Sequence, residues 1–240
     1  MRLNLARALP RSAANGPGER FVLWVQGCPL ACPGCWNPDT WAFKRRDLRS
    51  VEEVASTILT TEGIEGVTFT GGEPFAQARA LAALAERVRA AGLSVFVFTG
   101  YDLSELTREE HRALLALTDV VVTGRYIEAE RAEGLVWRGS TNQRVHFLSA
   151  RYSPTDMEGV AEVELHIHSD GGLTVTGFPD AELLTLTLGP RSPLPSQVSH
   201  PKLPDAQASP PASQPSQPTQ SHPQCTHAPS STRSTSTTTS

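Results

Sequence analysis

Three of the four cysteines in this chain of 240 residues lie close together, at Cys28, Cys32 and Cys35. Cysteine thiolates are soft ligands that suit zinc and iron–sulfur clusters. Structural zinc takes four ligands, and only three are local here. Three thiolates would instead hold three irons of a 4Fe-4S cluster and leave the fourth iron open. Because an open position on a metal centre is where chemistry takes place, the spacing favours a reactive cluster over structural zinc.

Short apolar segments that read as strands each end in a loop rich in glycine or polar residues. Residues 20–27 lead into the cysteines, and segments 66–70, 93–98 and 119–122 lead into Gly71-Gly72-Glu73-Pro74, Thr99-Gly100-Tyr101 and Thr123-Gly124-Arg125. Helical patterns lie between them, at 48–62, 75–91 and 104–117. This alternation predicts βαβ units and a parallel sheet, whose right-handed crossovers bring all four loops to one edge. In α/β sheets that edge is the usual ligand site.

Composition divides the chain. Residues 190–240 contain 12 Ser, 7 Thr, 11 Pro and 6 Gln, and they have no Phe, Trp, Tyr, Ile or Met. Such a segment cannot bury enough apolar surface to offset the entropy of ordering it. We therefore expect an N-terminal extension at 1–19, one α/β domain at 20–180 and a disordered tail at 181–240. Within the domain, segments 162–168 and 173–176 predict a short C-terminal β-hairpin.

The charge balance excludes one class of partner. The formal net charge is −4, and residues 190–240 carry three basic side chains against one acidic one, so the rest is more acidic than the whole. A non-specific nucleic-acid binder needs a basic surface instead. No apolar run approaches the length of a transmembrane helix, and the N-terminus lacks the apolar stretch of a secretory signal. We expect a cytoplasmic protein without nucleic-acid or membrane partners.

Several segments together carry a family resemblance. They are GCPLACPGCWNPDTW at 27–41, TGGEPF at 70–75 and WRGSTNQ at 137–143. With them the chain resembles the radical S-adenosylmethionine (SAM) enzymes, in the branch of proteins that activate anaerobic ribonucleotide reductase. The resemblance spans roughly residues 20–148. It implies an oxidoreductase whose α/β domain is a partial (β/α) barrel, and a lateral opening where the loop of a partner protein enters.

The resemblance also implies cofactors and their ligands. Each of the three clustered cysteines would bind one iron of a 4Fe-4S cluster, and the open iron would chelate SAM. One-electron cleavage of SAM would then give a 5′-deoxyadenosyl radical that abstracts a hydrogen atom. The glycine-rich loop would receive the SAM ammonium, Trp36 would contact the adenine, and Tyr101 would line the same edge. The full expected set of SAM-binding residues is Gly34, Trp36, Gly71, Gly72, Glu73, Pro74 and Tyr101.

Partners follow from the same resemblance. The substrate would be a glycyl-radical enzyme, the anaerobic ribonucleotide reductase. Because the sequence has no second cysteine cluster, the electron would come from an external donor such as flavodoxin. One departure stands out, since the family usually has an acidic residue where this chain has Thr123, with Arg125 two residues on. That departure, the hairpin and the tail keep one alternative open: a radical SAM enzyme with another peptide or small substrate. A second alternative is a non-catalytic 4Fe-4S module for electron transfer or redox sensing.

Overall fold

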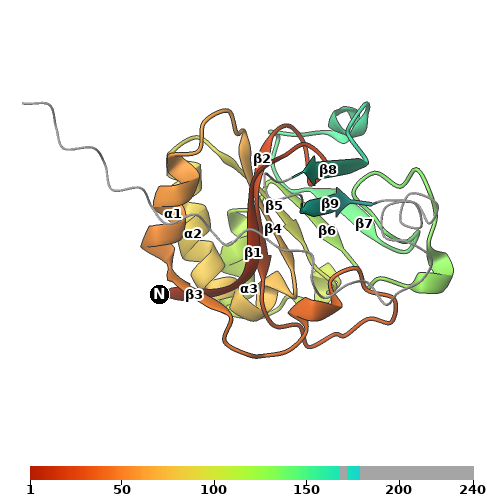
Figure 1. Cartoon of the computed structure of the whole chain (residues 1–240), viewed down its shortest axis with the longest axis horizontal. Helices are drawn as coiled ribbons and strands as arrows, with labels where there is room; N and C mark the ends of the chain where they lie inside the picture. Colours follow the sequence, from red (N-terminus) through yellow and green to blue (C-terminus); the bar gives the residue numbers. More distant parts are fainter. Residues whose placement is uncertain (168–171, 179–240) are drawn as a thin grey trace, which may run out of the picture. The chain divides into compact units, whose positions relative to one another are not determined.

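The computed structural model describes residues 1–167 and 172–178 (Figure 1). Its strands are β1 (Arg2–Ser12), β2 (Arg20–Val25), β3 (Asp47–Ser50), β4 (Gly66–Gly71), β5 (Ser94–Phe98), β6 (Val120–Thr123), β7 (Arg144–Phe147), β8 (Val163–Ile167) and β9 (Leu173–Gly177). Its α-helices are α1 (Val51–Leu59), α2 (Ala78–Ala90) and α3 (Glu109–Ala116). Short 3-10 helices are η1 (Pro38–Thr40), η2 (Pro74–Gln77), η3 (Leu103–Glu105), η4 (Glu128–Glu130) and η5 (Pro154–Met157).

The main sheet has the strand order β3-β1-β2-β4-β5-β6-β7. Its four central strands, β2, β4, β5 and β6, run parallel. The flanking strands β1 and β7 pair antiparallel with their neighbours. Because β2, β4, β5 and β6 share one direction, their carboxyl ends lie at one edge of the sheet, where the following loops meet. The mixed α/β class is therefore confirmed, with a sheet whose order ends at β3 and β7.

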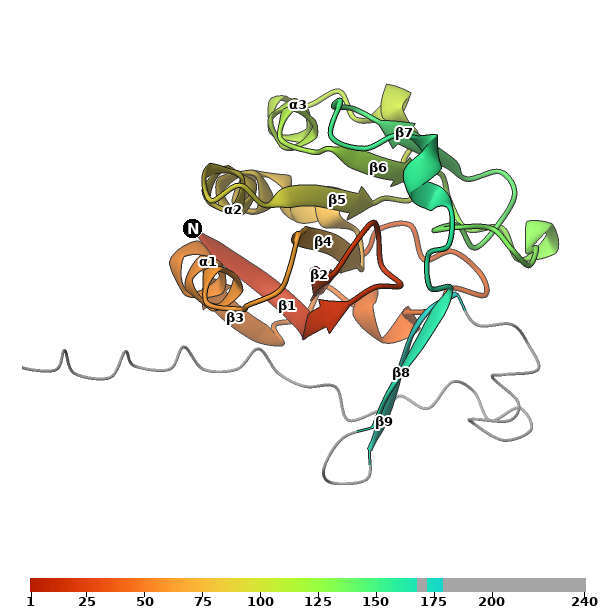
Figure 2. The same ribbon diagram turned by 90° about the horizontal axis from the view of Figure 1, so that it is seen from above.

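The two faces of the sheet are covered differently. Helices α1, α2 and α3 lie together on one side of it (Figure 2). Alternate strand residues such as Phe21, Leu23 and Phe69 face these helices in the larger apolar core. On the other face, Phe96 packs with Trp137 in a second cluster that loop residues cover. Successive residues of these strands point to opposite faces of the sheet, and both faces are buried. The parallel strands are therefore nearly continuous apolar runs.

The edges of the sheet differ from the sequence-based expectation. The expected extension at 1–19 contains β1, which pairs with both β2 and β3 and places Leu3 and Leu5 in the core. The expected helix at 48–62 begins at Val51, because β3 occupies the preceding residues and ends at its capping residue Ser50. The capping box of Ser50 with Glu53 is formed as predicted. Strand β7, which the sequence pattern did not indicate, completes the other edge.

Near the end of the described chain, β8 and β9 pair antiparallel, which confirms the predicted hairpin. Glu164 on β8 accepts hydrogen bonds from the Ala13 N–H, at 2.8 Å, and from the Ser12 hydroxyl, so the hairpin is attached to the end of β1. The predicted tail at 181–240 lies outside the described residues. Among the described residues, no helix is both long and apolar enough to cross a membrane.

Candidate functional site

The loops after β2, β4, β5 and β6 line one cavity, as their placement at one sheet edge predicts. All three clustered cysteines line it. Its other lining residues include Trp36, Asn37 and Trp41 from the cysteine loop, Thr70, Gly71, Gly72 and Glu73 after β4, Thr99 and Gly100 after β5, and Val122, Gly124, Tyr126 and Gln143 from the β6–β7 region. The topology thus brings together segments that are more than a hundred residues apart in the chain.

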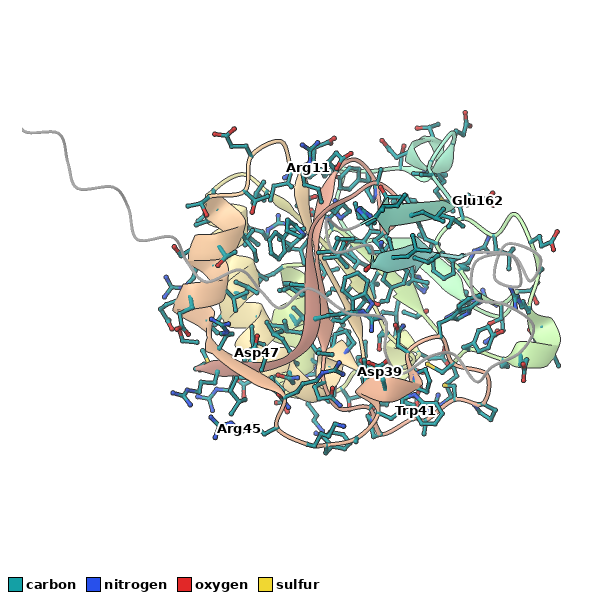
Figure 3. The ribbon with its side chains drawn as sticks, viewed as in Figure 1. Arg11, Asp39, Trp41, Arg45, Asp47 and Glu162 are labelled. Atoms are coloured by element: carbon teal, nitrogen blue, oxygen red, sulfur yellow. The ribbon has the colours of Figure 1, made fainter. Side chains whose placement is uncertain are left out.

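The cysteine loop is irregular and closed at its base. The Gly27 N–H donates to the Thr40 carbonyl at 2.7 Å, and the Cys28 N–H donates to the Trp41 carbonyl at 3.0 Å. Between these anchors, Ala31 has φ 46° and Gly34 has φ 72°, so the backbone turns through left-handed conformations. In Figure 3, Asp39 and Trp41 lie at the end of this loop, on and just after η1. The closed base fixes the loop that carries the three thiols.

The thiols fit a cluster better than a single metal ion. Burial raises the pKa of Cys28, Cys32 and Cys35 above its usual value, so a positively charged centre is needed to hold them as thiolates. Three thiols on one cavity wall, each free to bind a different iron, match the donor set of a 4Fe-4S cluster with an open iron.

Backbone N–H groups also point at the sulfurs. The Asn37 N–H donates to the Cys35 sulfur at 3.4 Å, and this hydrogen bond lowers the thiol pKa against the larger effect of burial. The Tyr126 N–H has the same effect on the pKa of Cys32. Nearby, the indole N–H of Trp36 is buried without a hydrogen-bond partner among the described residues. Such donors suit sulfide, thiolate or substrate acceptors.

Arg7 from β1 anchors the far end of the cysteine loop. Its guanidinium donates to the Asn37 side-chain oxygen, lies 3.6 Å from the Asp39 carboxylate, and stacks at 4.8 Å from the Trp24 ring. Burial lowers the pKa of Arg7 to about 10, which leaves it charged at neutral pH. No sequence pattern indicated this role, because Arg7 lies in the segment that we expected to precede the domain.

Glu73 joins two loops beneath the cavity. The side chain is buried, and its carboxylate accepts hydrogen bonds from the Phe75 N–H at 2.8 Å, the Thr99 hydroxyl at 2.9 Å and the Gly100 N–H at 2.9 Å. Burial raises the pKa of Glu73 to about 7, against the effect of these three donors. Glu73 therefore supports the loop after β4 and locks it to the loop after β5.

The two glycines before Glu73 are required by close packing against β2. A Cβ at Gly72 would lie 2.4 Å from the Gly27 carbonyl oxygen, and one at Gly71, which has φ 100°, would lie 2.7 Å from Trp24. The Gly72 N–H donates to Val25 O at 2.8 Å. The sequence pattern suggested that these glycines let a ligand approach. In the structure they are also required because the backbone of β2 and of the residues after it leaves no room for a side chain.

The segment WRGSTNQ holds the loop after β6. The Asn142 side chain donates to the Arg125 carbonyl at 2.8 Å, and the Gln143 side chain donates to the Gly124 carbonyl at 3.0 Å. From the other side, the Arg125 guanidinium makes two hydrogen bonds of 2.9 Å to the Glu105 carboxylate. These contacts fix the loop whose Tyr126 N–H points at Cys32. The clamp gives the segment a physical role that its residue types alone did not reveal.

Other residues named from the sequence lie at different depths. Trp36 lines the cavity, and the Arg131 guanidinium lies 4.9 Å from its ring. Gly34, Pro74 and Tyr101 are not among the residues that line the cavity. The Tyr101 ring instead stacks on His111 at 6.5 Å, with the Arg125 guanidinium at 5.9 Å. These rings lie beside the cavity loops and support them from the helix side.

Thr123, where an acidic residue was expected from the resemblance, is buried rather than in the cavity. It is 2% exposed, and its hydroxyl lies 2.9 Å from the His146 ring nitrogen of β7. Its neighbours Val122 and Gly124 line the cavity, whereas Thr123 does not. Thr123 therefore contributes to the contact between β6 and β7 rather than to the cavity wall.

Comparison with known proteins gives one matching family. The profile of the family described as 4Fe-4S single cluster domain matches residues 14–146. The crystal structure of QueE from Escherichia coli is 21% identical and covers 42% of this chain and 53% of its own, with a TM-score of 0.34. That similarity is too low to carry an argument about the site.

Curated relatives match over nearly their whole length. The anaerobic ribonucleoside-triphosphate reductase-activating protein of Haemophilus influenzae is 33% identical over 152 residues, which cover 60% of this chain and 97% of that protein. The proteins of the same name from Vibrio cholerae, at 35% over 152 residues, and from Enterobacteria phage T4, at 36% over 150 residues, cover 60% of this chain and 97% and 93% of their own lengths.

Proposed function

Because the chain belongs to the 4Fe-4S single cluster domain family, we propose that it is a radical SAM oxidoreductase that generates a glycyl radical on an anaerobic ribonucleoside-triphosphate reductase. Relatives named as activating proteins of that reductase support this function, since they match the chain at 33 to 36% identity over nearly their full lengths. The family model matches residues 14–146, a span that includes the cysteine loop, the glycine-rich loop and the clamp segment.

One observation carries the proposal. The cavity at the carboxyl edge of the parallel strands contains the three thiols on one wall and the Gly71-Gly72-Glu73 loop on another. A pure electron carrier needs the thiols alone. A second wall of backbone groups, held rigidly by Glu73, is what a site needs if it also positions an organic ligand beside the metal centre. The geometry therefore favours turnover over a non-catalytic module.

Each part of the cavity has a role in this proposal. Cys28, Cys32 and Cys35 would each hold one iron of the 4Fe-4S cluster. The backbone carbonyls of Gly71 and Gly72 would receive the SAM ammonium, and Trp36 would contact the adenine. Gly34, Pro74 and Tyr101 complete the proposed SAM site, Gly34 through its left-handed turn, Pro74 through the start of η2, and Tyr101 by supporting the adjoining loop.

The chemistry supplied by the bound groups is one-electron reductive cleavage of SAM, which yields a radical able to abstract hydrogen from a glycine. The chain's own residues would bind these groups and orient them. Glu73 fixes the spacing between the loops after β4 and β5, and the Asn142–Gln143 clamp fixes the loop after β6. Trp36, Trp41, Phe98 and Val122 supply apolar surface in the cavity, which limits the access of water to a reactive species.

The proposal includes the partners and the setting. The substrate would be a glycine loop of the reductase, which would enter through the lateral opening of a partial (β/α) barrel built on the open sheet. An external one-electron donor, such as flavodoxin, would supply the electron. The domain, expected at 20–180, would also include β1, which belongs to the main sheet. The enzyme would work in the cytoplasm, where thiols stay reduced.

Anaerobic reconstitution tests this function. The chain, loaded with iron and sulfide, is reduced and mixed with SAM and an anaerobic ribonucleoside-triphosphate reductase. We expect about four irons per chain, as cluster stoichiometry requires, an EPR spectrum that changes on adding SAM, and a glycyl-radical doublet on the reductase. A cluster that forms but ignores SAM would support the electron-transfer module instead. The triple variant Cys28→Ser, Cys32→Ser, Cys35→Ser is the control that should bind no cluster.

A further inference from the structure

An exposed aromatic side chain lies next to the cysteine loop, on the loop 42–46. Phe43 is 71% exposed. Its ring nevertheless packs on the chain just before the first cysteine, because a Cβ added at Gly27 would lie 2.8 Å from the ring. Gly27 immediately precedes Cys28. The Phe43 side chain thus faces solvent beside the residue that precedes Cys28, a proposed cluster ligand.

Two cationic residues follow Phe43 in the sequence. Lys44 and Arg45 are exposed, and neither forms an ion pair with any residue in the described part of the chain. Their neighbour Arg46 differs, since its guanidinium lies 3.0 Å from the Asp39 carboxylate. Figure 3 shows Arg45 at the surface near β3, pointing away from Trp41. The loop therefore has an aromatic centre next to the cysteine loop and a positive rim farther out.

The backbone of this loop is fixed in place. The Asn4 side chain donates to the Lys44 carbonyl at 2.8 Å and accepts from the Arg46 N–H at 3.0 Å. The Gln26 side chain donates to the Ala42 carbonyl at 2.6 Å. A surface held in this way loses little conformational entropy when a partner binds, and an exposed aromatic next to cations has the composition of a protein-binding site.

The loop lies outside the cavity. None of residues 42–46 is among those that line it. A protein bound at Phe43 would therefore leave the cavity open for a substrate, while remaining close to the backbone that carries Cys28. Electron transfer slows steeply with distance but needs no entry into the cavity. The sequence offers no second cysteine cluster as an internal relay, and within the proposed function an external donor supplies the electron.

We propose that Phe43, Lys44 and Arg45 form the docking surface of an acidic one-electron donor protein. The inference rests on the proposed function. In the step served by this surface, one electron leaves the reduced flavin or iron–sulfur centre of the donor and reduces the 4Fe-4S cluster by one electron, and no bond forms or breaks. On a chain with net charge −4, a positive rim at this place orients an acidic partner and disfavours other orientations.

Reduced flavodoxin, an acidic flavoprotein, is the probe. We would compare the full-length chain with the double variant Lys44→Glu/Arg45→Glu and with Phe43→Ser. The matched control is Arg79→Glu/Arg112→Glu, which changes the net charge equally at exposed positions on helices α2 and α3. Two quantities are measured for each: the Kd for flavodoxin at several salt concentrations, and the rate of cluster reduction by flavodoxin. Photoreduction by uncharged deazariboflavin checks that the cluster itself is intact.

We expect the double variant to bind flavodoxin at least tenfold more weakly, with a flatter salt dependence, and to be reduced by it correspondingly slowly. Phe43→Ser should weaken binding at every salt concentration. Deazariboflavin should reduce every variant at the wild-type rate, and the control should behave as wild type. Unchanged flavodoxin affinity in both surface variants would overturn the proposal, as would loss of reductase binding with flavodoxin binding retained.

The two proposals fail in different ways. If no glycyl radical forms with deazariboflavin as reductant, the proposed function is wrong whatever happens at Phe43. If the radical forms with deazariboflavin in every variant and the flavodoxin affinities are equal, the function stands and the docking surface is wrong.

Discussion

The carboxylate of Glu73 accepts a hydrogen bond of 2.9 Å from the backbone N–H of Gly100, which joins the loop after β4 to the loop after β5. The same carboxylate accepts from the Thr99 hydroxyl and from the N–H of Phe75 in its own turn. With three donors around its buried carboxylate, Glu73 fixes the loops after β4 and β5 relative to each other. The acidic residue of the glycine-rich loop, which also lines the cavity, therefore supports two of the cavity loops.

The first prediction concerns the pH dependence of stability. Burial raises the pKa of Glu73 from 4.5 to about 7, so the folded chain binds this proton more tightly than the unfolded chain. Its contribution to the free energy of unfolding is then most favourable below pH 4.5 and is lost as the pH rises to about 7. Denaturant unfolding of the cluster-free chain should show this decline, and Glu73→Gln should remove it. Parallel pH curves for the two proteins would contradict the assignment.

The second prediction concerns the contact between the glycine-rich loop and β2. In Gly72→Ala, the new Cβ would meet the Gly27 carbonyl oxygen at 2.4 Å, so the two loops must separate. We expect a loss of about 1–3 kcal/mol in unfolding free energy, as for other overpacked sites, and weaker iron retention. Gly92→Ala is the control, because its Cβ meets nothing within 4 Å and only its left-handed φ of 84° is strained. Equal iron retention in both variants would argue against this contact.

The third prediction tests Arg7 as a positioning residue for the cluster. The Arg7 guanidinium donates a hydrogen bond to the Asn37 side chain, and the backbone N–H of Asn37 donates to the Cys35 sulfur. Loss of the guanidinium in Arg7→Leu should cost about 2 kcal/mol, since hydrogen bonds to charged groups are worth about that much. It should also lower the reduction potential of the cluster, because a nearby positive charge is removed.

Arg7→Lys separates the two effects. Lysine keeps the charge, but its single ammonium group cannot contact Asn37 and Asp39 at the same time as the planar guanidinium does. We expect the potential to recover more than the stability does. Redox titration monitored by EPR, together with denaturant unfolding, makes the comparison. A potential that is equal in wild type, Arg7→Leu and Arg7→Lys would limit Arg7 to a purely structural role.

The fourth prediction concerns acid stability of the loop after β6. The hydrogen bonds from Arg125 lower the pKa of Glu105 from 4.5 to about 2. The resulting stabilisation is present above pH 4.5 and is lost as the pH falls toward 2. Because Glu105 is exposed, we expect a small effect on global stability and a clearer one on local hydrogen exchange of residues 124–126. Glu105→Gln should exchange faster near neutral pH and show less acid dependence than wild type.

The sequence alone determined most of the interior of this protein. The segments 20–27, 66–70 and 93–98 are continuous apolar runs because their strands are buried on both faces, and such runs are readable without a structure. The capping box at Ser50 is a local interaction, so it was readable as well. The cysteine motif and the glycine-rich loop could also be recognised from the sequence, because few other sites require these residue types at this spacing.

Only the tertiary structure decided how the site is supported. Arg7, Glu105 and Asn142 hold cavity loops from 17 to 30 residues away in sequence, through contacts that no local pattern encodes. Strands β1, β3 and β7 were missed because polar residues interrupt their apolar patterns, and pairing with a neighbour stabilises them more than their own propensity does. Long-range contacts of this kind are set by the folded sheet, which is why the docking loop at Phe43 and the clamp at Asn142 became visible only there.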